Sequence, residues 1–432
     1  MRGGPSAYCA AVSRALTTRM LIGLVAGASL GGAAHLGAAG SPWLDALIRY
    51  GTEPIGRVFL RLLFMLVIPL IVTALSLGVA GLGDLRRLSR IGVLTLVYTA
   101  VVSSIAVLIG VTLVNWVQPG RGLDPEDLAA LGAHAAGAPA GAAPVASGID
   151  LLVNMVPNNI VKAMAEGDML ALMVFSLFLG IGLAATPGEA ARRLEEGLQG
   201  LNDVVMRLLG FVIQLAPVAV ACLLFTLTAR LGYDVLARLG VYVAVVVGAL
   251  AIQQFGVYSA AVAWFGGMSP LKFFRGSRAA MLTAFSTASS NATLPTALLV
   301  ADRELGLPPH ISRFVLTLGS TANQNGTALF EGVTVLFLAQ VFGVELTLSQ
   351  QVTVVFICIL GGIGTAGVPA GSIPVIIMIL GLIGVPAEGI GIVLGVDRFL
   401  DMCRTTINVT GDLAAAVVVA HQERPKPPAT GA

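Results

Sequence analysis

Long apolar runs recur along the chain and predict membrane-spanning helices. A span needs about 20 mostly apolar residues. Runs of this kind lie at 19–38, 56–82, 91–117, 168–186, 203–228 and 239–265. A shorter apolar piece at 150–163 leads into the fourth run. Because the runs are continuous and do not alternate in polarity, they indicate helices, and the chain is predicted to be an all-α polytopic membrane protein.

After residue 265 the apolar segments become shorter, at 270–300, 311–341, 350–382 and 387–420. The first and third have small polar residues and a proline in their middle, which predicts re-entrant hairpins. Non-helical backbone at that depth must face protein or water. Two interrupted segments at matching places are the pattern of inverted repeats around a midplane site. Two kinked helices that cross the membrane remain the alternative.

Composition supports a membrane protein and excludes other classes. Of the 432 residues, 56% are hydrophobic and 11% are charged, whereas a soluble domain carries about 25% charge. The net charge is +2 without a long basic block, so no nucleic-acid partner is expected. The four cysteines are scattered, which favours apolar packing over metal binding.

The distribution of Lys and Arg predicts the orientation. Basic residues flank the loops on one side of the membrane if the spans alternate: Arg14, Arg19, Arg86, Arg87, Arg90, Arg192, Arg193, Lys272, Arg275, Arg278, Arg424 and Lys426. The loop after 91–117 is acidic instead, with Asp124, Glu126 and Asp127. Cytoplasmic sides carry the excess of positive charge, so both termini are expected in the cytoplasm. The absence of long insertions favours a bacterial inner membrane.

Two segments concentrate polar residues inside apolar surroundings. The segment Thr321–Thr327 is mostly polar or glycine, which predicts a break in the helix. An unwound helix frees carbonyl oxygens, which are suitable ligands for a hard cation such as sodium. Polar residues that only join helices by hydrogen bonds are the alternative.

The last helix carries its polar residues on one face. They are Asp397, Asp401, Arg404, Thr405, Asn408 and Asp412, at steps of 4, 3, 1, 3 and 4, which keep them on one face of the helix. Buried charges of this kind are costly unless a ligand or ion matches them. Asp401 and Arg404 could bind the ammonium and a carboxylate of a zwitterion. They could equally pair with each other.

Several motifs in a fixed order resemble the glutamate-transporter family of dicarboxylate/amino-acid:cation symporters over about 19–420. They are Phe64–Pro69, Met155–Asn159, the serine-rich stretch Phe285–Pro295, the break at Asn323–Thr327, Gly364–Pro369, Asp401–Thr405 and Asn408–Asp412. The resemblance implies eight transmembrane helices, two re-entrant hairpins and inverted repeats. It also implies a homotrimer and an elevator-type movement.

The resemblance divides the chain into a static scaffold and a moving transport domain. The implied parts are a cytoplasmic N-terminus (1–18), scaffold spans one and two (19–90), transport span three (91–117), an external Ala/Gly-rich loop (118–149), scaffold spans four and five (150–236), the rest of the transport domain (237–420, with hairpins at 270–300 and 350–382) and a disordered tail (421–432).

Site residues follow from the resemblance by position. Those implied for substrate are Ser290, Thr327, Val368, Gly371, Asp401, Arg404, Thr405 and Asn408. Those implied for two sodium ions, mostly through carbonyls, are Gly319, Thr321, Asn323, Gly362, Ile363, Thr365, Asn408 and Asp412. Ser103 and Asn325 mark a weakened third cation site, because Asn325 stands where relatives have Asp and Val102 where they have Thr.

A second departure concerns Asp401. Relatives place an arginine at the first hairpin tip or directly after this aspartate, whereas this chain has Ala288 and Met402 there. Asp401 therefore loses its usual arginine neighbour, which leaves affinity and substrate choice open.

The expected function is cation-coupled symport of aspartate or glutamate, with sodium as the expected cation and no cofactor. Arg404 argues against carriers of neutral amino acids, and Asp401 argues against pure dicarboxylate carriers. A proton-coupled carrier or a C4-dicarboxylate carrier of the same fold remains the alternative. An ion channel is disfavoured because the polar residues cluster in one half, and an enzyme because no catalytic motif occurs.

Overall fold

The computed structural model describes residues 5–38, 40–81, 89–122, 156–166, 169–232, 234–364 and 371–423, and these segments contain helices and no strand. The first half contains α1 (Pro5–Ala38), α2 (Pro42–Leu47), the π-helix η1 (Ile48–Thr52), α3 (Glu53–Gly81), α4 (Ser89–Val117), α7 (Ile160–Glu166), α8 (Met169–Ala185) and α9 (Glu189–Leu231). The second half contains α10 (Asp234–Ala251), η3 (Ile252–Val257), α11 (Tyr258–Ala260), η4 (Ala261–Phe265), α12 (Pro270–Thr287), α13 (Ser290–Arg303), α14 (Pro309–Ala322), α15 (Asn325–Val341), α16 (Leu348–Gly364), α17 (Ile373–Leu382), η5 (Ala387–Gly389) and α18 (Ile390–Gln422).

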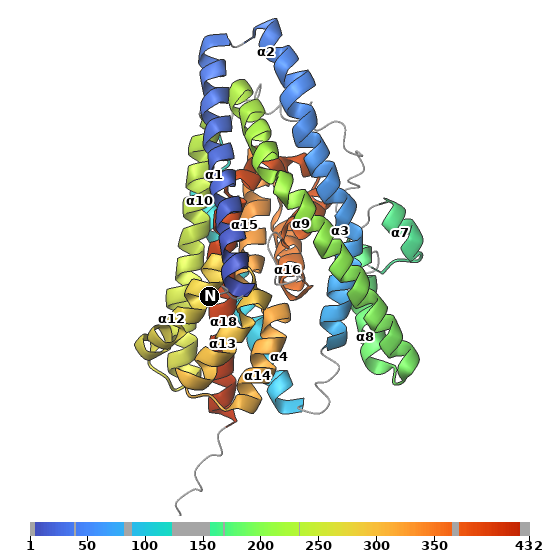
Figure 1. The fold of residues 1–432 in the computed structure, drawn as a ribbon, viewed down its shortest axis with the longest axis vertical. Helices are drawn as coiled ribbons and strands as arrows, with labels where there is room; N and C mark the ends of the chain where they lie inside the picture. The colour runs from blue at the N-terminus through green and yellow to red at the C-terminus, as the bar shows by residue number, and fades with distance from the viewer. Residues whose placement is uncertain are drawn as a thin grey trace, which may run out of the picture.

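Helix α9 packs against α1 and α3, and α3 also packs against α8 (Figure 1). The contact between α1 and α9 depends on glycines at four-residue spacing, Gly23, Gly27 and Gly31. A Cβ atom at Gly27 would lie 2.9 Å from the Cα atom of Ala221. Small residues at this spacing let two helix backbones approach closely inside a membrane.

A proline explains the bend in α9. The two parts of this helix, Glu189–Val212 and Gln214–Arg230, meet at 47°. Pro217 lies inside the helix, four residues after Ile213. Proline has no N–H to donate to the carbonyl four residues earlier, and its ring crowds that carbonyl. The bend is therefore at the position that the sequence dictates.

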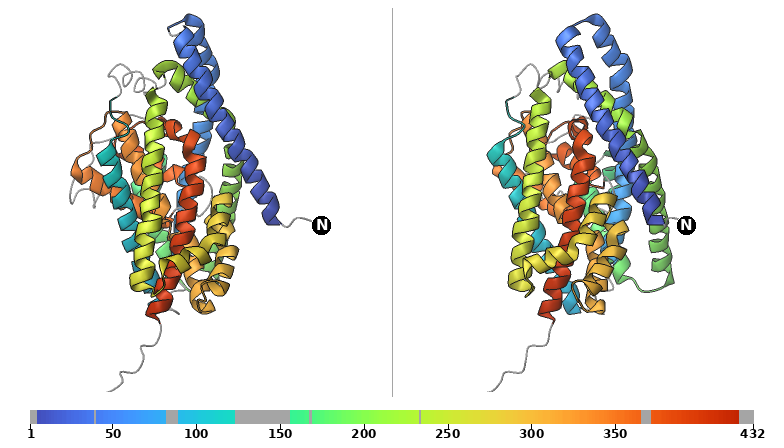
Figure 2. Two further views of the ribbon diagram at one scale, coloured as in Figure 1. Left: turned by 90° about the vertical axis from the view of Figure 1, so that its left-hand side faces the viewer. Right: turned by 60° about the vertical axis from the view of Figure 1, so that its left-hand side comes forward.

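Helix α18 runs through the middle of the second half and is buried along most of its length. It packs against α10, α12, α14 and α15, and Figure 2 shows α10 and α18 side by side in both views. It also contacts α1 and α9. The charged face of this helix therefore lies inside the protein.

The first predicted hairpin consists of α12 and α13, which pack on each other. Ser269 caps α12 by accepting a hydrogen bond from Lys272 N (3.4 Å), and Pro270 follows as the first helical residue. The helix ends at Ala288, whose φ of 49° is left-handed. Ser289 then caps α13 by accepting from Ala292 N (3.2 Å). The turn therefore consists of one helix end followed directly by the next helix start.

The second predicted hairpin corresponds to α16 and α17, which also contact each other. Its tip at 365–370 lies outside the described residues. The observed ranges, 270–303 and 348–382, extend the two predicted hairpins by a few residues.

Two predicted boundaries are wrong in detail. The break predicted over 321–327 is confined to Asn323 and Gln324, which separate α14 from α15. The predicted tail at 421–432 overlaps α18, which continues to Gln422, and residues 424–432 lie outside the described residues. The shorter break arises because Asn408 of a neighbouring helix hydrogen-bonds Gly326 and Thr327, which remain helical.

By length and composition, four helical stretches could cross a membrane: Thr18–Ala38, Pro42–Leu77, Arg90–Val117 and Ala237–Phe265. The bent α9 would be a fifth. These stretches are the ones found among the described residues, and the predicted total of eight spans stays a prediction. Broken helices such as α14–α15 and charged helices such as α18 do not meet a length and hydropathy criterion.

Candidate functional site

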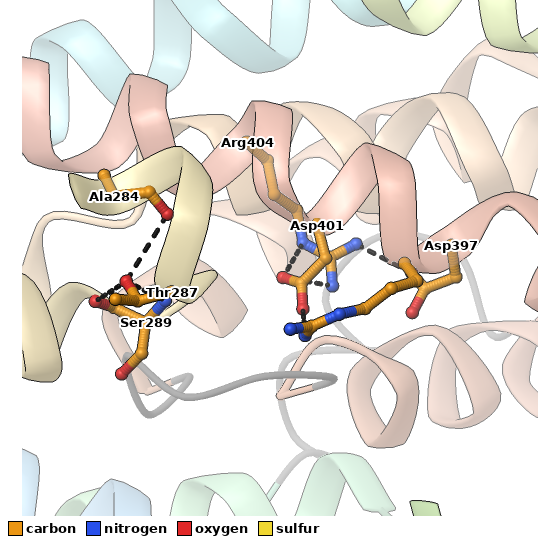
Figure 3. A network of polar contacts seen from close by, with 7 residues as sticks. Ala284, Thr287, Ser289, Asp397, Asp401 and Arg404 are labelled. Carbon is orange, nitrogen blue, oxygen red and sulfur yellow. Dashed lines mark hydrogen bonds and ion pairs between the residues drawn. The ribbon is translucent and has the colours of Figure 1, made fainter. Parts of the chain in front are cut away.

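Four charged side chains of α18 form a buried network. Arg404 Nη1 lies 3.0 Å from Asp397 Oδ1, and Arg404 Nη2 lies 3.0 Å from Asp401 Oδ1. Arg398 Nη1 lies 3.5 Å from Asp401 Oδ2. Figure 3 shows Arg404 directed toward both Asp401 and Asp397. Spacings of three and seven residues bring these groups together on one helix face.

Arg404 is the central cation of the network and is 2% exposed. Its guanidinium carbon lies 4.3 Å from the ring centroid of Phe330 on α15, so the ring covers its planar face. Its Nε donates a hydrogen bond to Asp401 Oδ1 (3.1 Å). Nη2 forms its ion pair with Asp401 Oδ1 but makes no hydrogen bond within the described part of the chain. The N–H groups of Nη2 can therefore turn to a further acceptor beside Asp401.

The network answers one open question and adds one residue. Asp401 and Arg404 do pair with each other, as the alternative interpretation allowed. Sequence reasoning missed Arg398, which lies beside Asp401 although the usual arginine positions hold Ala288 and Met402. The sequence signal was available, since Arg398 precedes Asp401 by three residues on a helix.

Asn408 joins α18 to the break between α14 and α15. Its Nδ2 donates to Gln324 Oε1 (2.5 Å) and to Thr327 Oγ1 (3.0 Å). Its Oδ1 accepts a hydrogen bond from Gly326 N (2.7 Å). These bonds satisfy backbone and side-chain groups that the break leaves open.

Asp412 lies one helical turn beyond Asn408 and faces the end of α14. Asn323 Nδ2 donates to Asp412 Oδ1 (2.9 Å), while Asn323 Oδ1 makes no hydrogen bond within the described residues. Gly319 lies so close to Asp412 that a Cβ atom there would collide with the carboxylate. A carboxylate and an open amide oxygen therefore lie beside a helix end that exposes carbonyl groups.

Asn325 is held by a separate chain of neutral hydrogen bonds. Ser103 Oγ on α4 donates to Asn325 Oδ1 (2.5 Å), and Asn325 Nδ2 donates to the Tyr258 hydroxyl (3.2 Å). Tyr258 in turn donates to the carbonyl of Ile407 (3.1 Å). The structure therefore brings together Ser103 and Asn325, the two residues of the third predicted cation site.

The hairpins contribute the remaining predicted residues. Ser290 begins α13 with its Oγ buried and without a hydrogen bond among the described residues, and Figure 3 shows the neighbouring turn. Thr405 and Gly371 are buried. A Cβ atom at Gly362 would lie 3.3 Å from the carbonyl oxygen of Gln324, so α16 passes close to the break.

Some predicted residues cannot be placed. Thr365 and Val368 lie outside the described residues. Thr321 and Ile363 belong to α14 and α16.

Sequence reasoning missed two buried residues near the site. Glu331 on α15 is fully buried, and a Cβ atom at Gly361 would lie 3.0 Å from its Oε2. Gln324, the partner of Asn408, donates from Nε2 to the carbonyl of Ser320 (2.9 Å). The available signal for Glu331 was an acidic residue inside an apolar run, since such residues mark substrate and ion pathways in membrane proteins.

Known proteins with similar sequences share a function class. The family model described as the sodium:dicarboxylate symporter family matches residues 16–422. A proton/sodium-glutamate symport protein of Bacillus subtilis is 33% identical over 94% of this chain and 92% of the relative. A proton/glutamate-aspartate symporter of Escherichia coli is 32% identical over 94% of this chain and 93% of the relative.

A C4-dicarboxylate transport protein of Mesorhizobium japonicum is 32% identical over 86% of this chain and 77% of the relative. The resemblance inferred from the motifs is confirmed. Symporters are membrane transporters and not enzymes, as predicted. The chain belongs to the sodium:dicarboxylate symporter family.

Proposed function

We propose that the protein is a cation-coupled symporter of aspartate or glutamate. The observation that carries this proposal is the buried Arg404, whose Nη2 is ion-paired with Asp401 but makes no hydrogen bond within the described residues. Arginine binds a carboxylate through its planar fork, and an aspartate suits an ammonium group. The names of the glutamate and aspartate symporters among the relatives support the same substrate class.

Binding requires the network on α18 to exchange partners. The side-chain carboxylate of the substrate would take Arg404, with Thr327 beside it, and the ammonium would take Asp401, assisted by Thr405. The α-carboxylate would meet Ser290 and Asn408. The segment Val368–Gly371 would close over the substrate. The pairing of Asp401 with Arg404 keeps both charges compensated when no substrate is bound.

Cation sites would combine one carboxylate with backbone carbonyls. The first would use Asp412 with the carbonyls of Gly319, Asn323 and Asn408. The second would use the carbonyls of Thr321, Gly362, Ile363 and Thr365. Oxygen ligands of this kind suit hard cations. The position of Asp412 beside the end of α14 supports the first site.

The family architecture supports an elevator-type homotrimer in a bacterial inner membrane, with both termini cytoplasmic. In this arrangement α1, α3, α8 and α9 belong to the scaffold, and α4 and α10–α18 to the transport domain. The close packing within each group supports the division. Eight spans and two re-entrant hairpins would then be related by inverted repeats.

The chain is expected to use fewer sodium ions than relatives that have Asp and Thr at the third site. The double variant Asn325→Asp with Val102→Thr restores the Asp and the Thr of this site. It is expected to raise the number of sodium ions transported per substrate, because a carboxylate compensates the desolvation of a cation better than an amide does. The reversal potential of aspartate uptake measures this number. The matched control pairs Asn325→Asp with Val101→Thr, whose side chain is exposed. An unchanged reversal potential in the restored variant would contradict the prediction.

Proton coupling is the second candidate, and Glu331 favours it. A fully buried carboxyl group in the membrane domain can take up and release a proton during transport. Several relatives are named proton symporters. A C4-dicarboxylate substrate is the other alternative, in keeping with the name of one relative.

Uptake of radiolabelled aspartate into proteoliposomes tests the proposal. A sodium gradient and a proton gradient are imposed separately, with liposomes that lack the protein as the control. Uptake driven by sodium supports the first candidate, and uptake driven only by protons supports the second. No uptake of aspartate or glutamate with either gradient would overturn the amino-acid assignment.

A further inference from the structure

Arg398 is a buried cation next to the proposed substrate-binding residues. Its side chain is 8% exposed, and that of its partner Asp401 is 5% exposed. Asp401 contacts Arg398 through Oδ2 and Arg404 through Oδ1. One carboxylate thus serves two guanidinium groups. A buried charge is costly without compensation. Whether the charges of Arg398 and Arg404 are compensated therefore depends on what Asp401 binds.

The surroundings of Arg398 make this dependence stronger. Together with Asp397 and Asp401 it lines a small cavity between α18 and four other helices. The other lining residues are apolar: Met20, Phe59, Leu63, Ala216, Val220, Ile373 and Leu394. Among the described residues that line this cavity, those contributed by α1, α3, α9 and α17 carry no charge. The carboxylates that line it together with Arg398 are those of Asp397 and Asp401.

The two substrate classes would act differently on this pair. An acidic amino acid brings an ammonium group, which competes with Arg398 for Asp401. A C4-dicarboxylate brings no cation, so it can bind only if something else offsets the charge of Asp401. Arg398 already does so. Without it, Asp401 would repel a second carboxylate, because like charges brought together in a desolvated site oppose binding.

We propose that Arg398 determines substrate selectivity by covering the charge of Asp401, so that the site accepts C4-dicarboxylates as well as acidic amino acids. This inference rests on the proposed function. It assigns Arg398 as a positioning residue that acts through Asp401, and it revises the expectation that Asp401 excludes dicarboxylates.

The test compares aspartate and succinate in the Arg398→Met variant, which keeps the length of the side chain and removes its charge. Succinate affinity is expected to fall about tenfold and aspartate affinity to rise by a smaller factor, because the ammonium no longer competes with Arg398. Both are measured in proteoliposomes, by direct uptake of each labelled substrate and by inhibition of aspartate uptake with succinate. Opposite changes distinguish selectivity from a general loss of structure.

Two further variants make the test independent of folding defects. Arg398→Lys is expected to retain succinate binding. The double variant Arg398→Met with Asp401→Asn is expected to regain succinate binding relative to Arg398→Met, because the repelling charge is also gone. Arg193→Met, a change of an exposed arginine on α9, is the matched control.

The outcomes separate this inference from the proposed function. Aspartate uptake that succinate does not inhibit in the unmodified protein would overturn the inference and leave the proposed function intact. An equal change for both substrates in Arg398→Met would also overturn it. Succinate uptake without aspartate uptake in the unmodified protein would contradict the amino-acid assignment. In that case, loss of succinate uptake in Arg398→Met would still support the role of Arg398. Transport of neither substrate would overturn both.

Discussion

Replacing Arg404 by alanine is expected to abolish binding of aspartate and glutamate. Truncating one partner of a buried charge pair between a protein and its ligand costs about 2–5 kcal/mol, which corresponds to a loss of affinity of roughly 30-fold or more. Arg404 is in contact with Asp397, Asp401 and Phe330, so its loss also removes the ion pair of Asp397 and leaves Asp401 with Arg398 alone. Substrate-dependent thermal stabilisation of the purified protein measures the change without requiring turnover.

Arg404→Lys separates charge from geometry. Lysine keeps the positive charge but cannot bind a carboxylate through two parallel hydrogen bonds. We expect it to preserve the thermal stability of the substrate-free protein better than alanine does, while acidic substrates still bind weakly. Undiminished aspartate and glutamate binding in Arg404→Ala would remove Arg404 from the substrate site.

Replacing Asp412 by asparagine is expected to weaken the dependence of transport on its coupling cation. The carboxylate is 3% exposed and accepts a hydrogen bond from Asn323, so the substitution removes a full charge from a desolvated position. The cation concentration for half-maximal aspartate uptake is expected to rise at least about tenfold, or ~1.4 kcal/mol. A cation titration of uptake in proteoliposomes provides the measurement.

Asp203→Asn is the matched control for this prediction. Asp203 lies on the exposed part of α9 and accepts a hydrogen bond from Gln199 (2.9 Å). The same chemical change there removes a solvated charge, and the cation titration is expected to stay as in the unmodified protein. An identical cation response in Asp412→Asn and the unmodified protein would place the ion site elsewhere.

Much of the helical organisation was predictable because the periodicity and the length of an apolar run depend only on consecutive residues. The apolar run at 91–117 became α4, and the run at 239–265 became the continuous stretch from α10 to η4. The first hairpin was also predictable, since Ser269, Pro270 and Ser289 are start signals that operate within one turn. The bend of α9 follows in the same way from Pro217.

The extent of the helix break was not predictable. The stretch 321–327 is polar, yet only Asn323 and Gln324 leave the helix. Asn408, which lies 81 residues after Thr327, supplies hydrogen bonds that keep Gly326 and Thr327 in place. A local pattern cannot reveal a partner that arrives from a distant helix.

The sequence by itself determined the family, the helical class and the polar face of α18, because motifs, apolar length and helical period are properties of consecutive residues. It also identified Asp401 and Arg404 as neighbours, because three residues make nearly one turn. Only the tertiary structure decided which charges compensate one another, because that depends on which apolar walls exclude water. Apolar residues of α1, α3 and α9 line the cavity that Arg398 shares with Asp397 and Asp401, and Phe330 from α15 covers Arg404. Burial by distant helices turns a row of polar residues into a network in which every charge needs a partner.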